Sequence, residues 1–360
     1  MKMNFEEFKQ QLMEDLKKYL PTEVGSGVEI AENAVEKLQH ESYDGITVKR
    51  EDSQIGINMD AGKLYADLEQ GKTYEDVLHY AVDVVQRSFE DVPKVDITKL
   101  LDYELMKETL TMQVIPVSGN EEMLHNIPHK EVEDLAIVYR FSVAQEDSGI
   151  ATILIKNDLL ERYGITAEQL HTDACEFAPI REQVSIKNMT EVLAEMMGPE
   201  FGEMLNEMPM GDGPAMYVAT NDSKVNGASV MMYPGFMEEA AEKTGGNFFV
   251  LPSSTHEILL IPEKDVDSYL MLQEMVQEVN MTQVSPEEKL SDNVYHYDVK
   301  DKVFELAESY EDRMKDKENS LDEKDSVLAD LKGKQKEISE KEPAKNVVEK
   351  ATKSKGGEAI

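Results

Sequence analysis

The sequence contains a single cysteine, Cys175, so no disulfide bond can form within the chain. Because disulfides persist mainly in oxidising compartments, this composition favours a reducing one. No positively charged segment followed by an apolar one opens the sequence, and no apolar run approaches the roughly 20 residues that a membrane helix needs. We therefore expect a cytoplasmic protein that does not act at a membrane.

Basic residues are also scarce: 37 lysines and arginines stand against 73 aspartates and glutamates, which gives a net charge of −36. Residues 311–360 contain 13 acidic and 12 basic residues, a net charge of −1, so the first 310 residues carry −35. Nucleic-acid affinity comes largely from neutralising phosphates with Lys and Arg, so this charge argues against nucleic acid as a partner. The acidic surface either keeps the protein soluble or attracts a basic protein partner.

Glycine-rich cofactor motifs are missing as well. The turns at 211–214 and 223–227 match neither a GxxxxGK[ST] phosphate loop nor a GxGxxG that follows a strand. No cofactor is therefore expected.

Hydrophobic residues make up 41% of the chain, which is sufficient for a packed core. Asn4 and Glu7 form the pattern of a helix capping box, and apolar residues then recur at helical spacing up to Pro21. Further helices are predicted over residues 30–39, 64–69 and 74–89, and a β-hairpin over 46–48 and 55–57.

The middle of the chain is richer in β-branched and apolar runs bounded by turn residues, which predict strands. The predicted strands cover residues 112–117, 135–144, 150–155, 216–220, 229–233, 247–251 and 258–261. Helices are predicted at 158–163, 167–177, 235–243 and from 262 to about 279. The helix at 235–243 stands between two predicted strands, so it indicates a crossover connection and a mixed sheet.

These elements predict an α+β fold with mixed sheets, flanking helices and two lobes. The expected parts are a helical lobe with a short hairpin at 1–95, an α+β lobe at 96–280, a linker and short helix at 281–310, and a charged tail at 311–360. The tail follows the last aromatic residue, Tyr310, and its charge is nearly balanced. We expect it to be disordered or transiently helical.

The segment from Pro252 to Glu257 offers hydroxyls, an imidazole and a carboxylate within a few residues. In an extended chain Ser254 and His256 share one side, whereas Glu257 faces the other. Ser254 and His256 can pair as nucleophile and base, although the set is a poor triad by itself. Alternatively, the hydroxyls satisfy turn amides and His256 bonds a neighbour at the start of a strand.

His171 and Cys175 lie four residues apart on a predicted helix and therefore share a face. This spacing suits a thiolate activated by histidine or a pair of metal ligands. Only Asp173 and Glu176 lie near as further ligands, and no CxxC or HExxH motif completes a site. The alternative is a buried cysteine on an amphipathic helix.

Methionines gather in a stretch interrupted by Gly and Pro, and they include Met196, Met197, Met204, Met208 and Met210. Methionine is flexible and polarizable, so such a cluster suits an adaptable binding surface. The alternative is a helix core under a long loop.

Several phrases together resemble an uncharacterised family of bacterial proteins known as a domain of unknown function. They are residues 134–140, 153–157, 216–221, 227–229 and 251–257, of which Pro-Ser-Ser-x-His-Glu is the most specific. The likeness spans about residues 1–280 and leaves the tail outside. It implies a cytosolic bacterial protein, often encoded near mobile or conjugative elements, and it implies no activity and no residue roles.

The leading hypothesis is a non-enzymatic binding or adaptor protein whose acidic surface and methionine-rich segment contact a protein partner. A rival hypothesis is a hydrolase-like enzyme built around Ser254 and His256. A third is an acidic mimic of nucleic acid, which requires carboxylates ranged along one face of the molecule.

Overall fold

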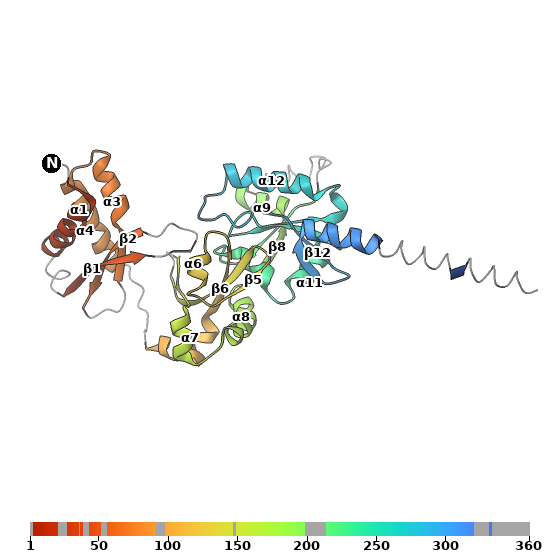
Figure 1. Cartoon of the computed structure of the whole chain (residues 1–360), viewed down its shortest axis with the longest axis horizontal. Coiled ribbons are helices and arrows are strands. Elements are labelled where there is room, and N and C mark those ends of the chain that lie inside the picture. Colours follow the sequence, from red (N-terminus) through yellow and green to blue (C-terminus); the bar gives the residue numbers. More distant parts are fainter. Residues whose placement is uncertain are drawn as a thin grey trace, which may run out of the picture. The chain divides into compact units, whose positions relative to one another are not determined.

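The computed structural model describes residues 3–20, 27–35, 37–38, 43–51, 56–90, 98–146, 149–198, 214–319 and 331–332. Both helices and antiparallel strands are abundant in them, which confirms the α+β class (Figure 1). Chain contacts define two compact units, Met1–Ala307 and Glu308–Ile360. Among the described residues, no helix is both long and apolar enough to cross a membrane.

The first ninety residues build helices around a three-stranded sheet in the order β1-β2-β3. The elements are α1 (Phe5–Tyr19), β1 (Val28–Val35), β2 (Tyr43–Arg50), β3 (Gly56–Asp60), α3 (Ala61–Glu69) and α4 (Tyr74–Glu90). The predicted capping box is present: Asn4 Oδ1 accepts from the Glu7 amide at 2.9 Å, and Glu7 Oε2 accepts from the Asn4 amide at 3.1 Å. Residues such as Phe8, Leu12 and Ile46 give this part its own buried core.

The helix predicted over 30–39 is wrong, because residues 28–35 form strand β1. Every residue of β1 pairs with β2, for example Ile30 with Val48. Most β1 side chains are exposed, so the sequence carries no clear alternation of apolar and polar residues. Pairing with β2 therefore overrides a local helical preference.

The following residues form two further sheets. A four-stranded sheet has the order β4-β6-β5, with β7 also beside β6, and a six-stranded sheet has the order β13-β12-β10-β11-β9-β8. The strands are β4 (Leu110–Pro116), β5 (His129–Val132), β6 (Leu135–Glu146), β7 (Gly149–Leu154), β8 (Val184–Asn188), β9 (Tyr217–Asn221), β10 (Phe248–Leu251), β11 (Ile258–Pro262), β12 (Tyr295–Asp298) and β13 (Val303–Leu306). The helices are α5 (Tyr103–Met106), α6 (Glu121–Leu124), α7 (Asn157–Tyr163), α8 (Ala167–Arg181), α9 (Met189–Met197), α11 (Phe236–Thr244) and α12 (Tyr269–Thr282).

The predicted crossover is not found, and all pairings between described strands are antiparallel. The prediction required a strand at 229–233, but residues Gly227–Met232 form the 3-10 helix η3. Consequently β10 follows α11 without a parallel partner and pairs with β11 and β12. The predicted start of a helix at Pro262 is also wrong, since α12 begins after its N-cap Ser268.

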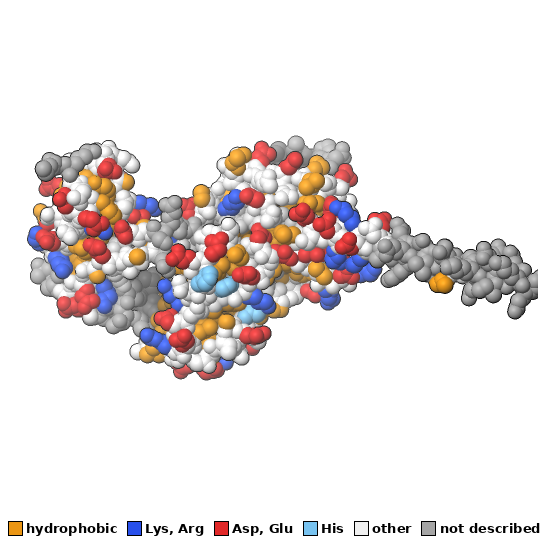
Figure 2. All heavy atoms as spheres, viewed as in Figure 1, with side chains coloured by type: hydrophobic (Ala, Val, Ile, Leu, Met, Phe, Trp, Pro, Cys, Tyr) orange, Lys and Arg blue, Asp and Glu red, His pale blue; other side chains and the backbone are white. Residues whose placement is uncertain are grey.

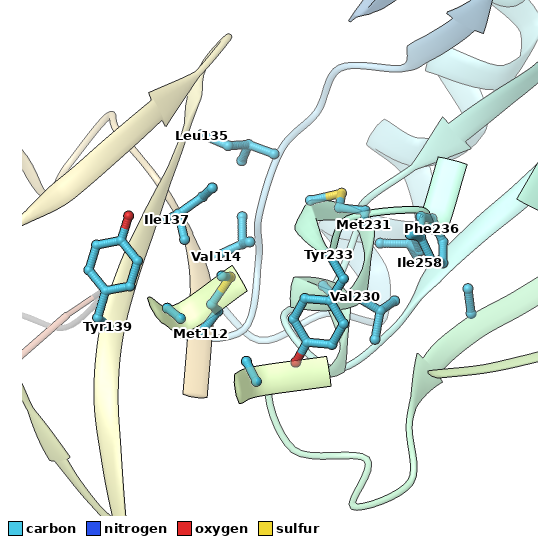
Figure 3. Close-up of a cluster of buried hydrophobic side chains, with 14 of the residues drawn as sticks. Met112, Val114, Leu135, Ile137, Tyr139, Val230, Met231, Tyr233, Phe236 and Ile258 are labelled. Carbon is cyan, nitrogen blue, oxygen red and sulfur yellow. The ribbon is translucent and has the colours of Figure 1, made fainter. Parts of the chain in front are cut away.

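The two sheets share one hydrophobic core (Figure 3). Alternate residues of β6, such as Leu135 and Ile137, point into it from the four-stranded sheet. Val230 and Met231 of η3 are buried between the sheets, and η3 contacts both β4 and β9. Ile258 of β11 belongs to the same core, so this short 3-10 helix joins the two sheets.

Residues 285–294, which lie in the region predicted as a linker and short helix (281–310), pack on this core. Leu290 and Val294 are buried, and the strands β12 and β13 that follow extend the six-stranded sheet. Helical residues 307–319 come next. The remainder of the predicted tail, apart from residues 331–332, lies outside the described residues.

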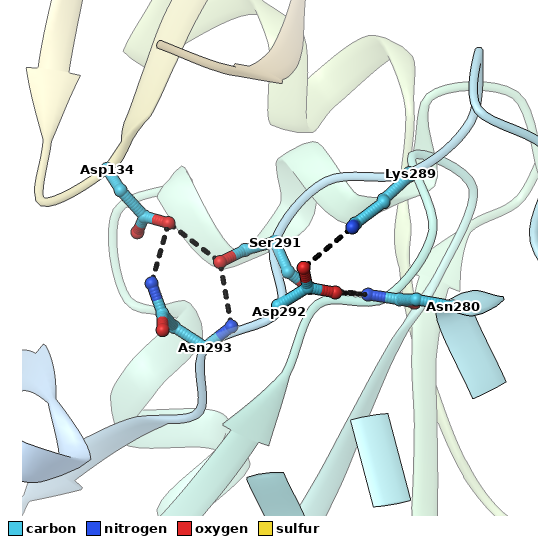
Figure 4. A network of polar contacts seen from close by, with 6 residues as sticks. All are labelled: Asp134, Asn280, Lys289, Ser291, Asp292 and Asn293. Atoms are coloured by element: carbon cyan, nitrogen blue, oxygen red, sulfur yellow. Dashed lines mark hydrogen bonds and ion pairs between the residues drawn. The ribbon is translucent and has the colours of Figure 1, made fainter. Parts of the chain in front are cut away.

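A carboxylate fastens this last segment to the four-stranded sheet (Figure 4). Asp134, in the turn between β5 and β6, accepts hydrogen bonds from Ser291 Oγ at 2.7 Å and Asn293 Nδ2 at 3.0 Å. The hydroxyl of Tyr295 donates to its other oxygen. One side chain therefore satisfies three donors that lie more than 150 residues further along the chain.

We expect Asp134→Ala to lower the free energy of unfolding by about 3 kcal/mol, because it leaves three donors without their charged acceptor. Urea denaturation measures the change. Asp267→Ala, which removes an exposed carboxylate, is the matched control and should alter stability by less than about 0.5 kcal/mol. Equal effects of the two substitutions would contradict the role given to Asp134.

Candidate functional site

The segment with Ser254 and His256 connects β10 to β11 and lies against residues 288–291. The Thr255 amide donates to the Glu288 carbonyl at 2.8 Å, and the Leu290 amide donates to the Ser253 carbonyl at 3.3 Å. Ser254 is buried, and its Oγ accepts from the backbone amide of His256 at 3.1 Å. The serine hydroxyl thus bonds the main chain of the turn.

The imidazole of His256 turns towards Glu288. Its Nε2 lies 3.4 Å from Glu288 Oε1, while Nδ1 is buried and has no hydrogen-bond partner among the described residues. The carboxylate of Glu257 is exposed. The hydroxyl of Ser254 therefore contacts the backbone of His256 and not its imidazole. The imidazole pairs with Glu288, which the sequence analysis did not indicate.

Gly227 shows how tightly this segment is packed. The Thr220 hydroxyl donates to the His256 carbonyl at 2.7 Å, and the Ala228 amide donates to the Thr255 carbonyl at 3.1 Å. A Cβ at position 227 would collide with Thr220 Oγ1 and with the His256 carbonyl oxygen. Only glycine fits here. Three of the phrases that carry the family likeness, 216–221, 227–229 and 251–257, meet at this point.

His171 and Cys175 share a face of α8, with the thiol 3.6 Å from His171 Nε2. Lys130 Nζ lies 3.1 Å from the same nitrogen, and the Tyr139 hydroxyl lies 2.9 Å from Nδ1. Burial raises the pKa of Cys175, and burial together with Lys130 lowers the pKa of His171. Both groups are therefore neutral at pH 7. Within the described residues, no group of three His, Cys, Asp or Glu side chains is placed to hold a metal.

A buried carboxyl group that the sequence analysis missed lies at the ends of β8 and β9. Glu182 accepts from Asn221 Nδ2 at 3.2 Å and from the Tyr233 hydroxyl at 3.3 Å. Burial raises its pKa, although these two hydrogen bonds act in the opposite direction. Glu182, Asn221 and Tyr233 are all buried, so this group is part of the core and is not open to a ligand.

Helices α9 and α12 lie on one face of the six-stranded sheet (Figure 1), and both carry exposed apolar side chains. Leu272 and Val276 of α12 pack on the sheet with Phe249 and Ile261, and Glu195 of α9 pairs with Lys187 of β8 at 2.6 Å. The outward apolar side chains form what we call the Met surface. Its members and their exposed fractions are Met196 (77%), Met197 (62%), Leu270 (55%), Met271 (67%) and Met281 (82%).

The Met surface carries negative charge and no positive charge of its own. Neither α9 nor α12 contains a lysine or arginine. Glu274 and Glu278 lie on the exposed side of α12 with Leu270 and Met281, and they form no ion pair with any residue in the described ranges. Figure 2 shows red carboxylates beside orange apolar side chains where α12 lies. The surface therefore combines flexible apolar groups with uncompensated carboxylates.

The sequence indicated only part of this surface. Met196 and Met197 were singled out by their clustering, whereas Met204, Met208 and Met210 fall outside the described residues. The contribution of α12 to this surface was not predicted. The spacing of the apolar residues in α12 could have indicated it. Their positions are spread too widely around the helix to form one buried stripe, as at Leu270, Leu272, Met275 and Met281.

Gly227→Ala should lower the free energy of unfolding by about 3 kcal/mol, since the added methyl group meets backbone and hydroxyl oxygens that cannot both move away. Gly62→Ala, inside α3, is the control, because alanine favours a helix and only one side-chain oxygen is near. Thermal denaturation of both variants provides the measurement. A fully stable Gly227→Ala protein would show that η3 is not held as closely as described.

Because Ser254 is buried and the imidazole of His256 turns to Glu288, we expect no labelling by a serine-directed fluorophosphonate probe. Intact-mass spectrometry of the treated protein measures labelling, and a known serine hydrolase serves as the positive control. Adduct formation at Ser254 that disappears in the His256→Ala protein would contradict this expectation and would favour the hydrolase hypothesis.

Comparisons with known proteins identify a family and no relative of known activity. Residues 5–299 match a family described as "Family of unknown function (DUF5688)". No curated protein and no solved structure matches the chain significantly. The matched region contains both the Ser254–His256 segment and the Met surface. Since the match covers most of the sequence, the chain belongs to this family of unknown function.

Proposed function

We propose that the protein is a non-enzymatic binding or adaptor protein whose Met surface binds a basic amphipathic segment of a protein partner. The observation that carries this proposal is the combination of exposed methionines on α9 and α12 with the unpaired carboxylates of Glu274 and Glu278 on α12. We further propose that it acts in the bacterial cytoplasm, as the family resemblance implies.

The apolar part of the Met surface supplies the affinity in this proposal. Burying apolar surface contributes about 25 cal/mol per Å2, so a partner that covers Met271 and Met281 gains several kcal/mol before the costs of association. Methionine side chains adapt to partners of different shape because they are unbranched and polarizable. A partner helix with an apolar stripe fits such a surface.

The carboxylates supply the selectivity. Glu274 and Glu278 flank the apolar residues of α12, so lysines or arginines beside the apolar stripe of a partner can pair with them. The net charge of −36 steers basic partners towards the protein and repels acidic ones. A binding role needs no catalytic group, and Ser254 Oγ already bonds the main chain.

The test uses a fluorescein-labelled amphipathic peptide of leucine and lysine, with a leucine–glutamate peptide of the same pattern as comparison. Fluorescence anisotropy should show micromolar binding of the lysine peptide that weakens as salt is raised. The double substitution Met271→Ser and Met281→Ser should weaken binding at least about tenfold, because it removes the most exposed apolar groups of α12.

Ile180→Ser is the matched control, since Ile180 of α8 is 71% exposed and lies outside the Met surface. It should leave the affinity unchanged. Binding of the glutamate peptide with similar affinity would contradict the charge argument. Equal affinities of the control and the double variant would contradict the assignment of the site to α12.

A further inference from the structure

A pocket of about 480 Å3 lies on the face of the four-stranded sheet that points away from the shared core. Its lining includes Gln113 of β4, Arg140 of β6, Thr152 of β7 and Lys156. Its size is in the range of small-molecule sites in proteins. Neighbouring strands thus contribute polar side chains to one hollow.

Arg140 is held in place by neutral groups. Its Nε donates to Thr152 Oγ1 at 2.8 Å, and its Nη1 donates to Gln113 Oε1 at 3.2 Å. No carboxylate in the described ranges forms an ion pair with it, and burial lowers the pKa of its guanidinium. A guanidinium has five N–H donors, so this arrangement fixes its direction and leaves donors for a ligand.

The charge of the pocket is opposite to that of the protein. Lys37 and Lys156 line it together with Arg140, and no aspartate or glutamate occurs among its described lining residues. In a chain with twice as many acidic as basic residues, such a local excess of cations is unusual. A partly desolvated arginine without a counter-charge is costly unless an anion binds to it.

We propose that this pocket binds a small organic phosphate monoester. The planar fork of Arg140 matches two phosphate oxygens, and Lys156 adds a second positive charge near a group that carries about two negative charges. Leu154 and Met123 also line the pocket and offer an apolar contact for the organic part of the ligand. A carboxylate has one charge and uses fewer of these donors.

This site is independent of the proposed function, because it lies on a different sheet and attracts ligands of opposite charge. Isothermal titration of the full chain at low ionic strength, with phenyl phosphate, inorganic phosphate and benzoate, tests it. Phenyl phosphate should bind with one saturable site, more tightly than inorganic phosphate, and benzoate should bind at least about tenfold more weakly.

Substitutions of lining residues test whether the ligand binds in this pocket. Arg140→Gln should reduce the affinity for phenyl phosphate at least about tenfold, and Lys156→Gln about threefold, whereas Lys300→Gln, an exposed lysine elsewhere, is the charge-matched control. Lys156 is exposed, so its substitution tests the site even if Arg140→Gln unfolds the protein. Three outcomes would overturn the proposal: no binding of phenyl phosphate, equal effects of Lys156→Gln and Lys300→Gln, or equally tight binding of benzoate.

Discussion

The close approach of η3 to β9 and to the backbone of His256 is the constraint from which the rest of the larger unit follows. Without a side chain at Gly227, the 3-10 helix lies directly on the strand, and Val230 and Met231 reach the core that both sheets share. Asp134 then fixes the end of the six-stranded sheet to the turn between β5 and β6. The apolar contacts thus supply the burial, and one carboxylate adds a polar connection between the sheets.

Because each sheet turns one face to this core, the side chains on its other face point away from the core. Some of them are covered, as Val138 and Phe249 are, whereas Arg140 lines a pocket. On β6 the inward residues are apolar, and the alternation that buries Tyr139 places Arg140 on the outside. On β10 the same alternation places the side chain of Phe248 in the shared core and that of Phe249 on the face covered by α12. Both candidate surfaces are therefore consequences of strand periodicity and of one buried interface.

Local features were predictable from the sequence, whereas features that join distant segments were not. The capping box at Asn4, the helices α4 and α7, and the strands β4 and β6 follow from patterns within a few residues. Strand β1, helix η3 and the strands after residue 294 depend on partners elsewhere in the chain, such as the contact of Asp134 with Ser291. The Arg140 pocket was not predictable for the same reason. Arg140 is oriented by Gln113 of β4 and Thr152 of β7, and the sequence alone does not place these residues beside it.

The overall charge does not decide what the Arg140 pocket can bind. At physiological ionic strength, charges beyond about 8 Å are largely screened, so the groups lining the pocket determine the local potential. There the cations of Arg140, Lys37 and Lys156 meet no acidic neighbour in the described lining. On the Met surface the local and the overall charge agree, so both favour the basic partner that we propose. The two proposals, a small anion on one sheet and a basic protein segment beside the other, are therefore compatible in one strongly acidic protein.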